Sequence, residues 1–500
     1  KLIVRVQESP GAPCAMGSQF QDIMKHIRDH SDLCWSLQKW EPSSIFRPMI
    51  KSSLNDGVFL AVIMKHLTDT GYLEDGSKVD STELSKIILS TLNEIRHSQQ
   101  MKYVRSFGYI LSKLFRHLFH KLCIDKRNIN LIRYKFKDTP VLLLPSHRSY
   151  LDFLLVSYLH FYYHLPVPIV AAGIDFKSMK CVGEMMRNAG AFFIRRSFNT
   201  DKLYSIVLKK YFTYCLVSGN SPIEFFLEGT RSRNGITKYP KFGLLSSAIE
   251  TYLRKQVCDI LVVPIAIVYD RVVEENLYAY ELLGQPKPKE STWGLLKAAH
   301  VLKEGFGNVF IRYGDPLYVK DHFEDLVYPS MNPTARSVLA PVHRDKVKQF
   351  ALSVLESQQQ VAVIPLFSLI ASILQYYHCS SQEITLNQLS GHIESLNSIL
   401  PNPDILPCYS GNVDELREAL EVHKNIIRVD GDKLTLLVTD VQHQKTLPVK
   451  GTIPSSVMNT AVTHLVLQIY VNQMLFHFHH ISSILCPLLY SDTAGFDASK

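Results

Sequence analysis

A histidine and an aspartate stand five residues apart in the segment SHRSYLD, residues 146–152. A carboxylate that fixes one imidazole nitrogen leaves the other nitrogen able to take a proton from a substrate hydroxyl. On one continuous helix His147 and Asp152 would point about 140° apart, because successive residues turn by ~100°. We therefore expect His147 in a loop and Asp152 in the first turn of the following helix, where the two side chains can meet.

Two further segments carry arginines directly after apolar residues. Residues 190–196 (GAFFIRR) end in Arg195 and Arg196, and residues 225–233 (FFLEGTRSR) end in Glu228, Gly229, Thr230, Arg231, Ser232 and Arg233. Guanidinium groups present planar forks of donors that suit phosphate oxygens, and a glycine lets the backbone approach a ligand closely. Lys238 and Lys241 add positive charge nearby.

A proline interrupts the apolar segment VVPI, residues 262–265. Proline inside a strand lacks a ladder donor, so Pro264 predicts a bulge or an edge strand, often beside a ligand channel.

Each of these signals has a plainer alternative. Among 20 histidines, about one pair with the spacing of His147 and Asp152 is expected by chance, and the aspartate could simply cap a helix. The arginine segments could be solvated turns, with Glu228 paired to Arg231. Pro264 could lie in an ordinary edge strand.

The surrounding pattern predicts how these residues are positioned. Short apolar runs at 140–145, 167–172, 191–194, 223–227 and 260–268 are typical of buried strands, and helical stretches at 152–160, 177–188, 201–218 and 242–254 separate them. Strands that alternate with helices indicate an α/β fold with a mostly parallel sheet covered by helices. Active sites of such sheets lie at the carboxyl ends of the strands, where the histidine, the aspartate and the four arginines all fall.

Three regions follow from this pattern: a helical N-terminal region (1–125), an α/β catalytic domain (126–325) and a mainly helical C-terminal region (326–500). Residues 101–122 predict a basic amphipathic helix, which can pack on its own domain or make peripheral contact with an anionic membrane. Residues 361–377 form the longest apolar run, but it contains Pro365 and is short for a span of ~20 residues. We expect a buried or interfacial helix there, a surface loop at 284–291 and a hinge at 328–334.

Composition narrows the function classes. The chain has 500 residues, 46% hydrophobic and 20% charged, with a net charge of +8, which suits an anionic ligand or membrane. Zinc-finger, leucine-zipper and RRM-like patterns are missing, so we expect no nucleic-acid partner. Nine cysteines without a C-x-x-C pair indicate free thiols in a reducing compartment. Residues 1–16 lack the apolar core of a signal peptide, and no metal motif is found.

Taken in order, the HxxxxD, GAFFIRR, EGTRSR and VPI segments closely resemble the four sequence blocks of the glycerolipid acyltransferase family. The resemblance implies a glycerol-3-phosphate acyltransferase-like fold, with acyl-CoA as co-substrate and no cofactor or metal. It implies that His147 is the general base and Asp152 its partner. It further implies that Arg195 or Arg196, with Arg231 and Arg233, binds the acceptor phosphate in a pocket shaped by Glu228, Gly229 and Ser232. Pro264 would lie on the acyl-CoA side.

Within this family, residues 226–233, 240–245 and 280–291 look most like the branch that acylates dihydroxyacetone phosphate. That branch implies the first step of ether-lipid (plasmalogen) synthesis, on the matrix side of the peroxisomal membrane, and a possible complex with the alkyl transferase of the same pathway. The chain ends in Asp497-Ala-Ser-Lys500, which is not an S-K-L-like peroxisomal address.

Other functions remain to be weighed. A glycerol-3-phosphate 1-O-acyltransferase would keep the same residues and mechanism. A lipid thioesterase or hydrolase needs an activated serine, yet Ser146 and Ser149 flank the histidine without a G-x-S-x-G elbow. A non-catalytic scaffold is disfavoured by intact motif residues. A nucleotide-binding enzyme is disfavoured because neither glycine-rich phosphate motif occurs.

Overall fold

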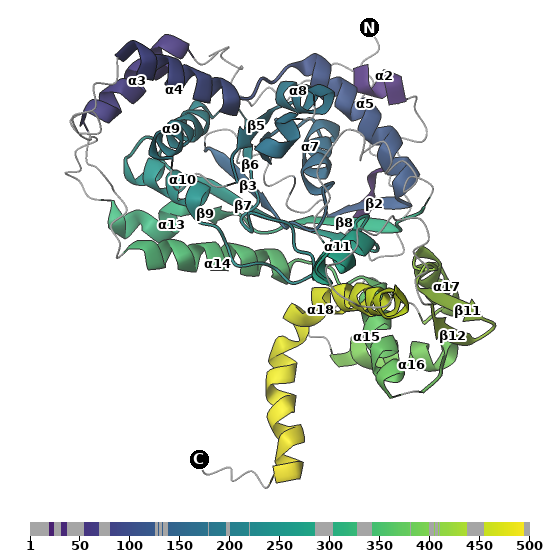
Figure 1. Ribbon diagram of the computed structural model, residues 1–500. Coiled ribbons are helices and arrows are strands. Elements are labelled where there is room, and N and C mark those ends of the chain that lie inside the picture. Colours follow the sequence, from purple (N-terminus) through teal and green to yellow (C-terminus); the bar gives the residue numbers. More distant parts are fainter. Residues whose placement is uncertain are drawn as a thin grey trace.

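The computed structural model describes residues 20–24, 32–37, 55–69, 81–125, 129, 133, 139–178, 180–196, 201–219, 221–285, 304–327, 343–380, 382–399, 405, 409, 411–437 and 455–494. A large twisted sheet lies between two layers of helices, and the C-terminal residues form a separate lobe below it (Figure 1).

Among the described residues, nine strands build the large sheet, in the order β1-β2-β8-β7-β3-β6-β4-β5 with β9 beside β7. The five strands β7-β3-β6-β4-β5 are all parallel, while β8 and β9 pair antiparallel with β7, and β1 with β2. The fold class is therefore the predicted α/β arrangement around a mostly parallel sheet. The strands are β1 (Phe20–Asp22), β2 (Lys121–Asp125), β3 (Val141–Pro145), β4 (Ile169–Gly173), β5 (Ala191–Ile194), β6 (Ile223–Glu224), β7 (Leu261–Tyr269), β8 (Asn308–Tyr313) and β9 (Leu317–Tyr318).

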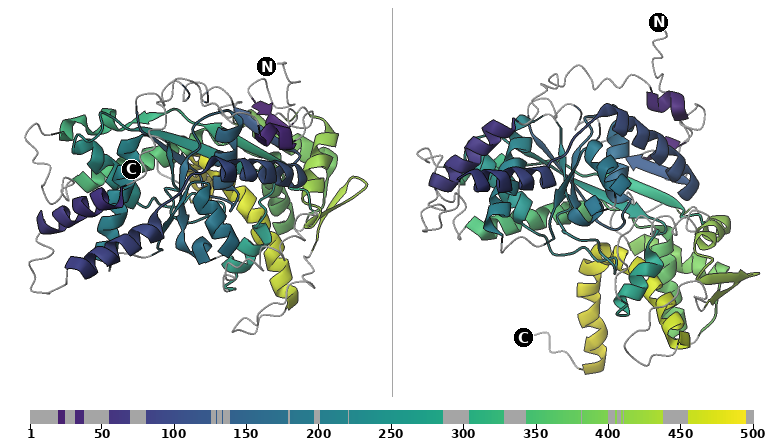
Figure 2. Two further views of the ribbon diagram at one scale, coloured as in Figure 1. Left: turned by 90° about the horizontal axis from the view of Figure 1, so that it is seen from above. Right: turned by 45° about the horizontal axis from the view of Figure 1, so that its top comes forward.

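Alternation along the strands sends side chains into two cores, because successive residues of a strand point to opposite faces. In β3, Leu142 and Leu144 join one core, and Val141 and Leu143 join the other. The first core is covered by α3 (Asp56–Asp69), α4 (Ser81–Ile95), α9 (Lys202–Ser218), α10 (Gly243–Leu253), α13 (Val319–Phe323) and α14 (Arg344–Gln360). The opposite face is covered by α2 (Asp32–Leu37), α5 (Met101–Leu118), α7 (Asp152–Tyr162) and α8 (Lys180–Asn188). Figure 2 shows the two layers from further directions.

The five predicted strands and four predicted helices are present with shifted ends. The strand predicted at 223–227 is shorter, since β6 stops at Glu224, and the helix predicted at 177–188 is divided into a 3-10 turn (Ile174–Ser178) and α8. The amphipathic helix predicted at 101–122 ends at Leu118, and β2 follows directly. The sheet thus draws on residues before 126, so that position does not divide helices from strands.

The C-terminal lobe has its own apolar core. It contains α15 (Leu366–Cys379), α16 (Leu386–Ile399), α17 (Val413–Val422), α18 (Ser455–Ala494) and a small antiparallel sheet of β10 (Ile384–Thr385), β12 (Lys433–Leu436) and β11 (Ile427–Asp430). The long apolar run forms α15, with Pro365 at its N-cap and most of its side chains buried in this core. In the part of the chain that the structure describes, no helix has the length and apolar character needed to cross a membrane.

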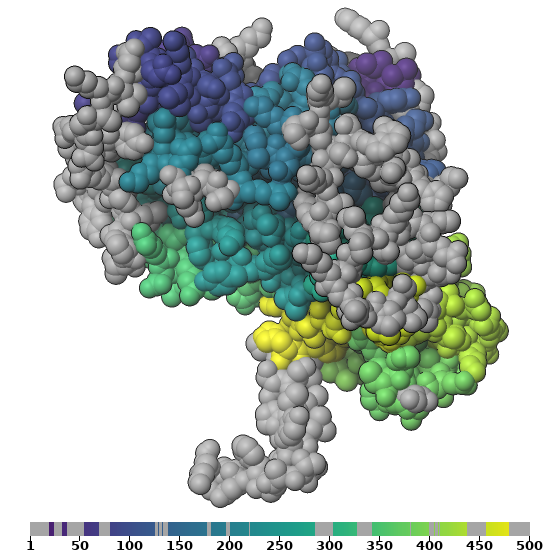
Figure 3. All heavy atoms as spheres, in the orientation of Figure 1, coloured from purple at the N-terminus to yellow at the C-terminus, as the bar shows by residue number. Residues whose placement is uncertain are grey.

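The lobe and the α/β part touch through α18 and α11 (Glu275–Leu282). In Figure 3 the yellow atoms of α18 lie against teal atoms of the α/β part. Asn472 Nδ2 donates to the carbonyl oxygen of Asn234, 2.7 Å away. A Cβ atom at Gly235, where φ is +81°, would overlap the carbonyl oxygen of Ile469. The loop predicted at 284–291 lies mostly outside the described residues, and the hinge predicted at 328–334 lies wholly outside them.

Candidate active site

His147 lies in the loop after β3, and Asp152 is the first residue of α7, as the spacing predicts. His147 Nδ1 and Asp152 Oδ2 are 2.9 Å apart. Oδ2 also accepts the backbone N–H groups of Arg148 and Ser149 at 2.7 and 2.8 Å. Tyr269, the last residue of β7, donates its hydroxyl to Oδ1 at 2.6 Å. A fully buried carboxylate with these four partners fixes the position of the imidazole.

The protonation of His147 follows from this arrangement. A carboxylate that accepts two N–H groups at Oδ2 favours a proton on Nδ1, which leaves Nε2 as the acceptor nitrogen. Nε2 has no hydrogen-bond partner among the described residues. Burial lowers the pKa of His147, and the neighbouring Asp152 carboxylate only partly opposes this shift. The imidazole is therefore neutral near pH 7 and can take up a proton at Nε2.

The ring of Phe226 lies flat against the imidazole, with ring centroids 3.7 Å apart and an angle of 13° between the planes. Phe226 lies after the end of β6. Its sequence neighbours Phe225 and Leu227 point into the first of the two cores described above. Phe226 thus covers one face of the imidazole and helps to fix its orientation. This contact was not identified from the sequence.

Glu228 is buried and organises the loop that carries His147. Its Oε1 accepts the backbone N–H of His147 at 2.9 Å, and its Oε2 accepts the backbone N–H of Lys238 at 2.8 Å. Arg148 Nη1 lies 3.2 Å from both carboxylate oxygens. The ion-pair partner of Glu228 is therefore Arg148 and not Arg231, the partner considered from sequence.

A third carboxylate, Glu274 at the start of α11, holds the same loop from the other side. It accepts the Ser149 hydroxyl at 2.9 Å and the backbone N–H of Tyr150 at 2.7 Å. Burial raises the pKa of Glu274, although these hydrogen bonds and Arg231 oppose the shift. Sequence reasoning missed Glu274 and Tyr269, because each reaches the loop from more than 100 residues away and neither belongs to a local motif.

Arg231 and Arg233 lie beside the His147 loop, because the N–H of Ser232 between them donates to the carbonyl oxygen of His147 at 2.9 Å. Arg231 is almost fully buried, and its guanidinium carbon lies 3.2 Å from the centre of the Tyr150 ring. It also bonds the hydroxyl of Tyr278 at 3.1 Å. Arg233 pairs with Glu281 at 2.8 Å.

The turn between Glu228 and Arg231 depends on Gly229. Its φ is +70°, and a Cβ atom there would lie 2.7 Å from Lys241 Cγ. The Ser232 hydroxyl donates to the carbonyl oxygen of Ile236 at 2.6 Å. These bonds shape the turn, and a role of its residues in phosphate binding stays a prediction.

The structure separates Arg195 and Arg196 from this group. They follow β5, which lies three strand positions from β3, about 14 Å at ~4.8 Å per strand. Arg195 bonds both Glu94 oxygens at 2.7 and 2.9 Å, and Arg196 pairs with Asp175. Of the two arginine segments, the one with Arg231 and Arg233 is thus in direct contact with the His147 loop, and the described part of the other is not.

Pro264 does not lie in an edge strand, as one of the sequence interpretations had it. β7 is an inner strand, where Pro264 stands opposite Leu144 of β3. On the other side of β7, β8 pairs with residues 265–269 and β9 with 261–262. Pro264 falls in the gap between these two ladders, where a missing N–H interrupts no hydrogen bond.

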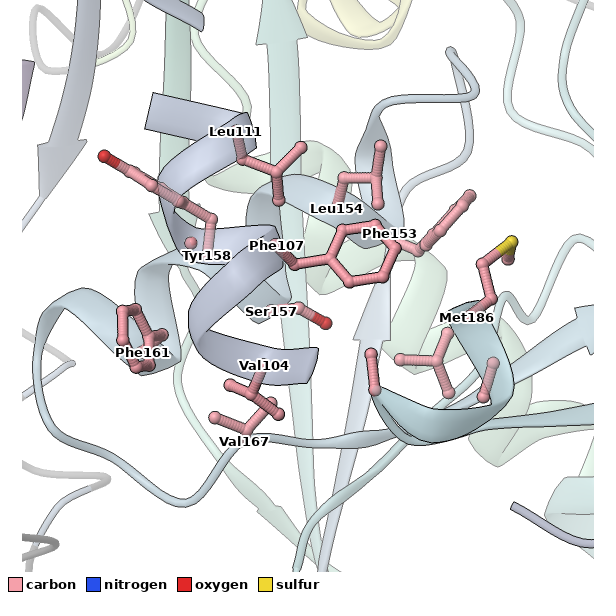
Figure 4. A pocket seen from close by; sticks show the side chains of 14 residues that line it. Val104, Phe107, Leu111, Phe153, Leu154, Ser157, Tyr158, Phe161, Val167 and Met186 are labelled. Carbon is pink, nitrogen blue, oxygen red and sulfur yellow. The ribbon is translucent and has the colours of Figure 1, made fainter. Parts of the chain in front are cut away.

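An apolar pocket of about 50 Å³ lies on the far side of α7 (Figure 4). Val104, Phe107 and Leu111 of α5 face Phe153 and Leu154 of α7 across it. Its lining contains no charged side chain and shares none of the residues that bond to His147. Within the described residues, no group of three or more His, Cys, Asp or Glu side chains could hold a metal ion.

Comparison with known proteins agrees with this architecture. Residues 124–268 match the family model "Acyltransferase", and residues 278–499 match "Glycerol-3-phosphate acyltransferase C-terminal region". The α/β domain with the His–Asp pair is therefore of the acyltransferase class.

The dihydroxyacetone phosphate acyltransferase of Bos taurus is 35% identical over 450 residues, which cover 86% of this chain and 65% of that protein. The protein of the same name from Oryctolagus cuniculus is 42% identical over 309 residues, 60% of this chain and 44% of the relative. A glycerol-3-phosphate acyltransferase of Xanthomonas axonopodis is 37% identical over 229 residues, 46% of this chain and 25% of the relative. This chain is therefore similar to glycerolipid acyltransferases over most of its length, and it spans less than two thirds of the length of these relatives.

Among solved structures, the 1-acyl-sn-glycerophosphate acyltransferase PlsC of Thermotoga maritima matches with 14% identity, over 61% of this chain and 92% of that one. Its TM-score of 0.29 is too low to support an argument.

Proposed function

We propose that this protein transfers a long-chain acyl group from acyl-CoA to the hydroxyl of dihydroxyacetone phosphate. The observation that carries the proposal is the His147 imidazole, which is held at Nδ1 by Asp152 and has Nε2 available beside the Arg231 loop. The most similar relatives named above support the acceptor, since their names specify acylation of dihydroxyacetone phosphate.

The reaction uses His147 as a general base and needs no protein nucleophile. Nε2 takes the proton from the acceptor hydroxyl while the hydroxyl oxygen forms a bond to the thioester carbonyl carbon. The carbon–sulfur bond then breaks, the acyl group stays on the acceptor, and the CoA thiolate takes up the proton from His147. Arg231 and Arg233 supply positive charge for the acceptor phosphate, with Arg195 or Arg196 as the more distant candidates.

Glycerol 3-phosphate is the second candidate acceptor. The bacterial relative described above carries this substrate in its name, and the same base and arginines would serve both acceptors. The two differ at the second carbon, which is a ketone in one and a hydroxyl in the other.

The geometry disfavours a serine hydrolase. The Ser146 hydroxyl donates to the carbonyl oxygen of Ile267 and accepts its N–H, and the Ser149 hydroxyl donates to Glu274. Both serines are therefore held by partners other than His147, whereas a nucleophile needs to bond its base.

The wider biological role is part of the proposal. Acylated dihydroxyacetone phosphate would enter ether-lipid (plasmalogen) synthesis, with the protein on the matrix side of the peroxisomal membrane and in reach of the alkyl transferase. The basic amphipathic α5 supports peripheral membrane contact, because Tyr109 and Ile110 are exposed on it.

The deciding experiment is CoA release from palmitoyl-CoA by the purified protein in detergent, with both acceptors offered in parallel. We expect release that depends on dihydroxyacetone phosphate. Preference for glycerol 3-phosphate would move the protein to general glycerolipid synthesis. Release without any acceptor, together with an acylated serine, would favour the hydrolase.

A further inference from the structure

A cavity of about 90 Å³ lies next to the His147 loop, on the side of the lobe. Its walls come from Ser146 and Arg148, from the turn at 235–237, from residues 266–269 of β7, from the C-terminal end of α14 and the two residues 362–363 after it, and from residues 472–477 in the middle of α18. It reaches the surface at Ile236 and Leu475, which are 45% and 44% exposed. A space of this size holds about six to nine water-sized groups.

One side-chain atom in the wall, Gln358 Oε1, accepts no hydrogen bond from the residues that the structure describes. Gln358 of α14 is 2% exposed, and its Nε2 donates to the carbonyl oxygen of Leu144 in β3. Its Oε1 is buried and accepts no hydrogen bond. A buried acceptor without a donor is destabilising, so the cavity favours an occupant that brings an N–H or O–H group to Gln358.

The charges of the lining side chains further restrict which chemical group can bind in the cavity. The guanidinium of Arg148 is already bonded to Glu228 through Nη1 and to Thr237 through Nη2. Burial lowers the pKa of His477 to about 4, so that side chain is neutral near pH 7. The other polar side chains of the lining are the amides of Gln358, Gln359, Asn472 and Gln473 and the hydroxyls of Ser146, Thr237 and Tyr269. A phosphate would lack a free cation here, and a bare hydrocarbon chain would leave Gln358 Oε1 without a donor.

We propose that this cavity receives the thioester end of the pantetheine arm of the acyl-CoA donor, with Gln358 Oε1 accepting an amide N–H group of the arm. The arm carries two amides on an otherwise apolar chain, which matches a lining of amides and of Ala266, Val268, Val363 and Phe476. This inference rests on the proposed function, because it assumes an acyl-CoA donor.

The position of the cavity agrees with this assignment. Ser146 and Arg148 in its wall flank His147, so a thioester at the end of an arm bound here lies next to the base. Pro264, predicted for the acyl-CoA side, points to the same face of β7 as Ala266, two residues further along the strand.

Two variants and one control test the inference. Ala266→Leu fills the cavity, and Gln358→Leu removes the acceptor at nearly the same volume. Gln360→Leu is the control, since Gln360 is exposed on the same helix and bonds only Glu356 among the described residues. Binding of CoA and of a non-reactive palmitoyl-CoA thioether is measured by calorimetry, and the KM values for palmitoyl-CoA and for the acceptor by steady-state kinetics.

We expect each cavity variant to weaken CoA binding and raise the KM for palmitoyl-CoA by about tenfold, the effect of one lost hydrogen bond or a blocked site. The acceptor KM and the Gln360→Leu values stay at wild type. A palmitoyl thioester of ethanethiol, which lacks the arm, reacts equally with wild type and Gln358→Leu. If Ala266→Leu fails to fold, Gln358→Leu decides.

Other results overturn the inference. If folded Gln358→Leu binds CoA as tightly as the wild type does, the arm does not bind in this cavity. If only the KM for the acceptor rises, the acceptor binds there. The failure of the proposed function looks different: wild-type protein then binds CoA, and Gln358→Leu weakens that binding, although no acyl transfer occurs with either acceptor.

Discussion

His147 owes its position to residues from three separate segments. Asp152 bonds its Nδ1, Phe226 covers its ring, and Glu228 accepts its backbone N–H. Tyr269 in turn holds the second oxygen of Asp152. The imidazole is therefore held in one orientation, in which Nε2, the nitrogen that we propose takes the proton, faces away from the carboxylate.

We expect His147→Ala to keep the fold and to lower turnover by about 100-fold or more, because general-base catalysis is lost. The test is CoA release at saturating palmitoyl-CoA and acceptor, with circular dichroism to confirm folding. Activity close to wild type in a folded variant would contradict the role of His147.

The pKa of His147 makes a separate prediction about pH. Burial lowers this pKa from its ordinary value of about 6.5, and the base works only when neutral. The acid limb of kcat/KM for palmitoyl-CoA is thus expected below pH 6.5, with activity constant above it and falling as pH drops through the lowered pKa. A midpoint above 6.5 would show that the imidazolium is stabilised instead.

Arg231→Lys tests the phosphate site. Lysine keeps the charge but loses the planar fork that lies on Tyr150. We expect the KM for dihydroxyacetone phosphate to rise by about tenfold with little change in the KM for palmitoyl-CoA. The variant's melting temperature serves as control, because Arg231 is buried. An unchanged acceptor KM would transfer phosphate binding to Arg233 or to the β5 arginines.

At the scale of elements, the loop between β3 and α7 is clamped by carboxylates from other loops. Glu228 comes from the turn after β6, and Glu274 from the start of α11. Glu274→Gln keeps one acceptor oxygen but loses the charge near Arg231. We expect it to lower kcat with little change in either KM, and to destabilise the fold by about 1–3 kcal/mol.

Kinetics and urea unfolding of the Glu274→Gln protein are the measurements. Glu281→Gln is the comparison, since Glu281 pairs with Arg233 and is not among the residues that bond the loop. Equal kcat in wild type and Glu274→Gln would mean that the clamp only stabilises the fold.

The elements that carry the motifs were predictable because their apolar runs are continuous and their helices are bounded by polar turns. β2 and β8 were not predicted, since each carries a charged residue that is buried in the sheet. Arg312 of β8 is buried and pairs with Asp125 of β2 at 3.1 Å. Their apolar runs, residues 122–124 and 309–311, are interrupted by these charges, and the partner that neutralises each charge is almost 190 residues away along the chain. The same holds in the site: His147 and Asp152 lie in one motif, whereas Tyr269 and Glu274 depend on tertiary contacts.

At the scale of the whole molecule, α18 ties the lobe to the α/β part. Tyr470 donates to Glu275 and accepts the backbone N–H of Val272 at 3.0 Å, beside the buried pair of Arg271 and Glu275. Tyr470→Phe removes the hydroxyl that bonds Glu275 Oε2 and the backbone N–H of Val272, while Glu275 Oε1 keeps its bond to Arg271. We expect a loss of about 1–3 kcal/mol in unfolding free energy, measured by urea denaturation.

Tyr409→Phe is the matched control, because Tyr409 bonds only Ser390 within the lobe among the described residues. If both substitutions lower the unfolding free energy equally, the contact between α18 and α11 contributes no more to stability than a hydrogen bond within the lobe does. A separate, earlier unfolding transition of the lobe in Tyr470→Phe would show that this contact couples the two parts.

The packing of Gly235 against α18 has a consequence for genetics. The turn that continues from Arg233 is covered by Ile469 and bonded by Asn472. A premature stop codon anywhere from 283 to 454 would leave all four sequence blocks intact in the gene product, yet remove the helix that supports this turn. Nonsense alleles at these positions should therefore be as severe as missense changes at His147, and counting intact motifs would misjudge them.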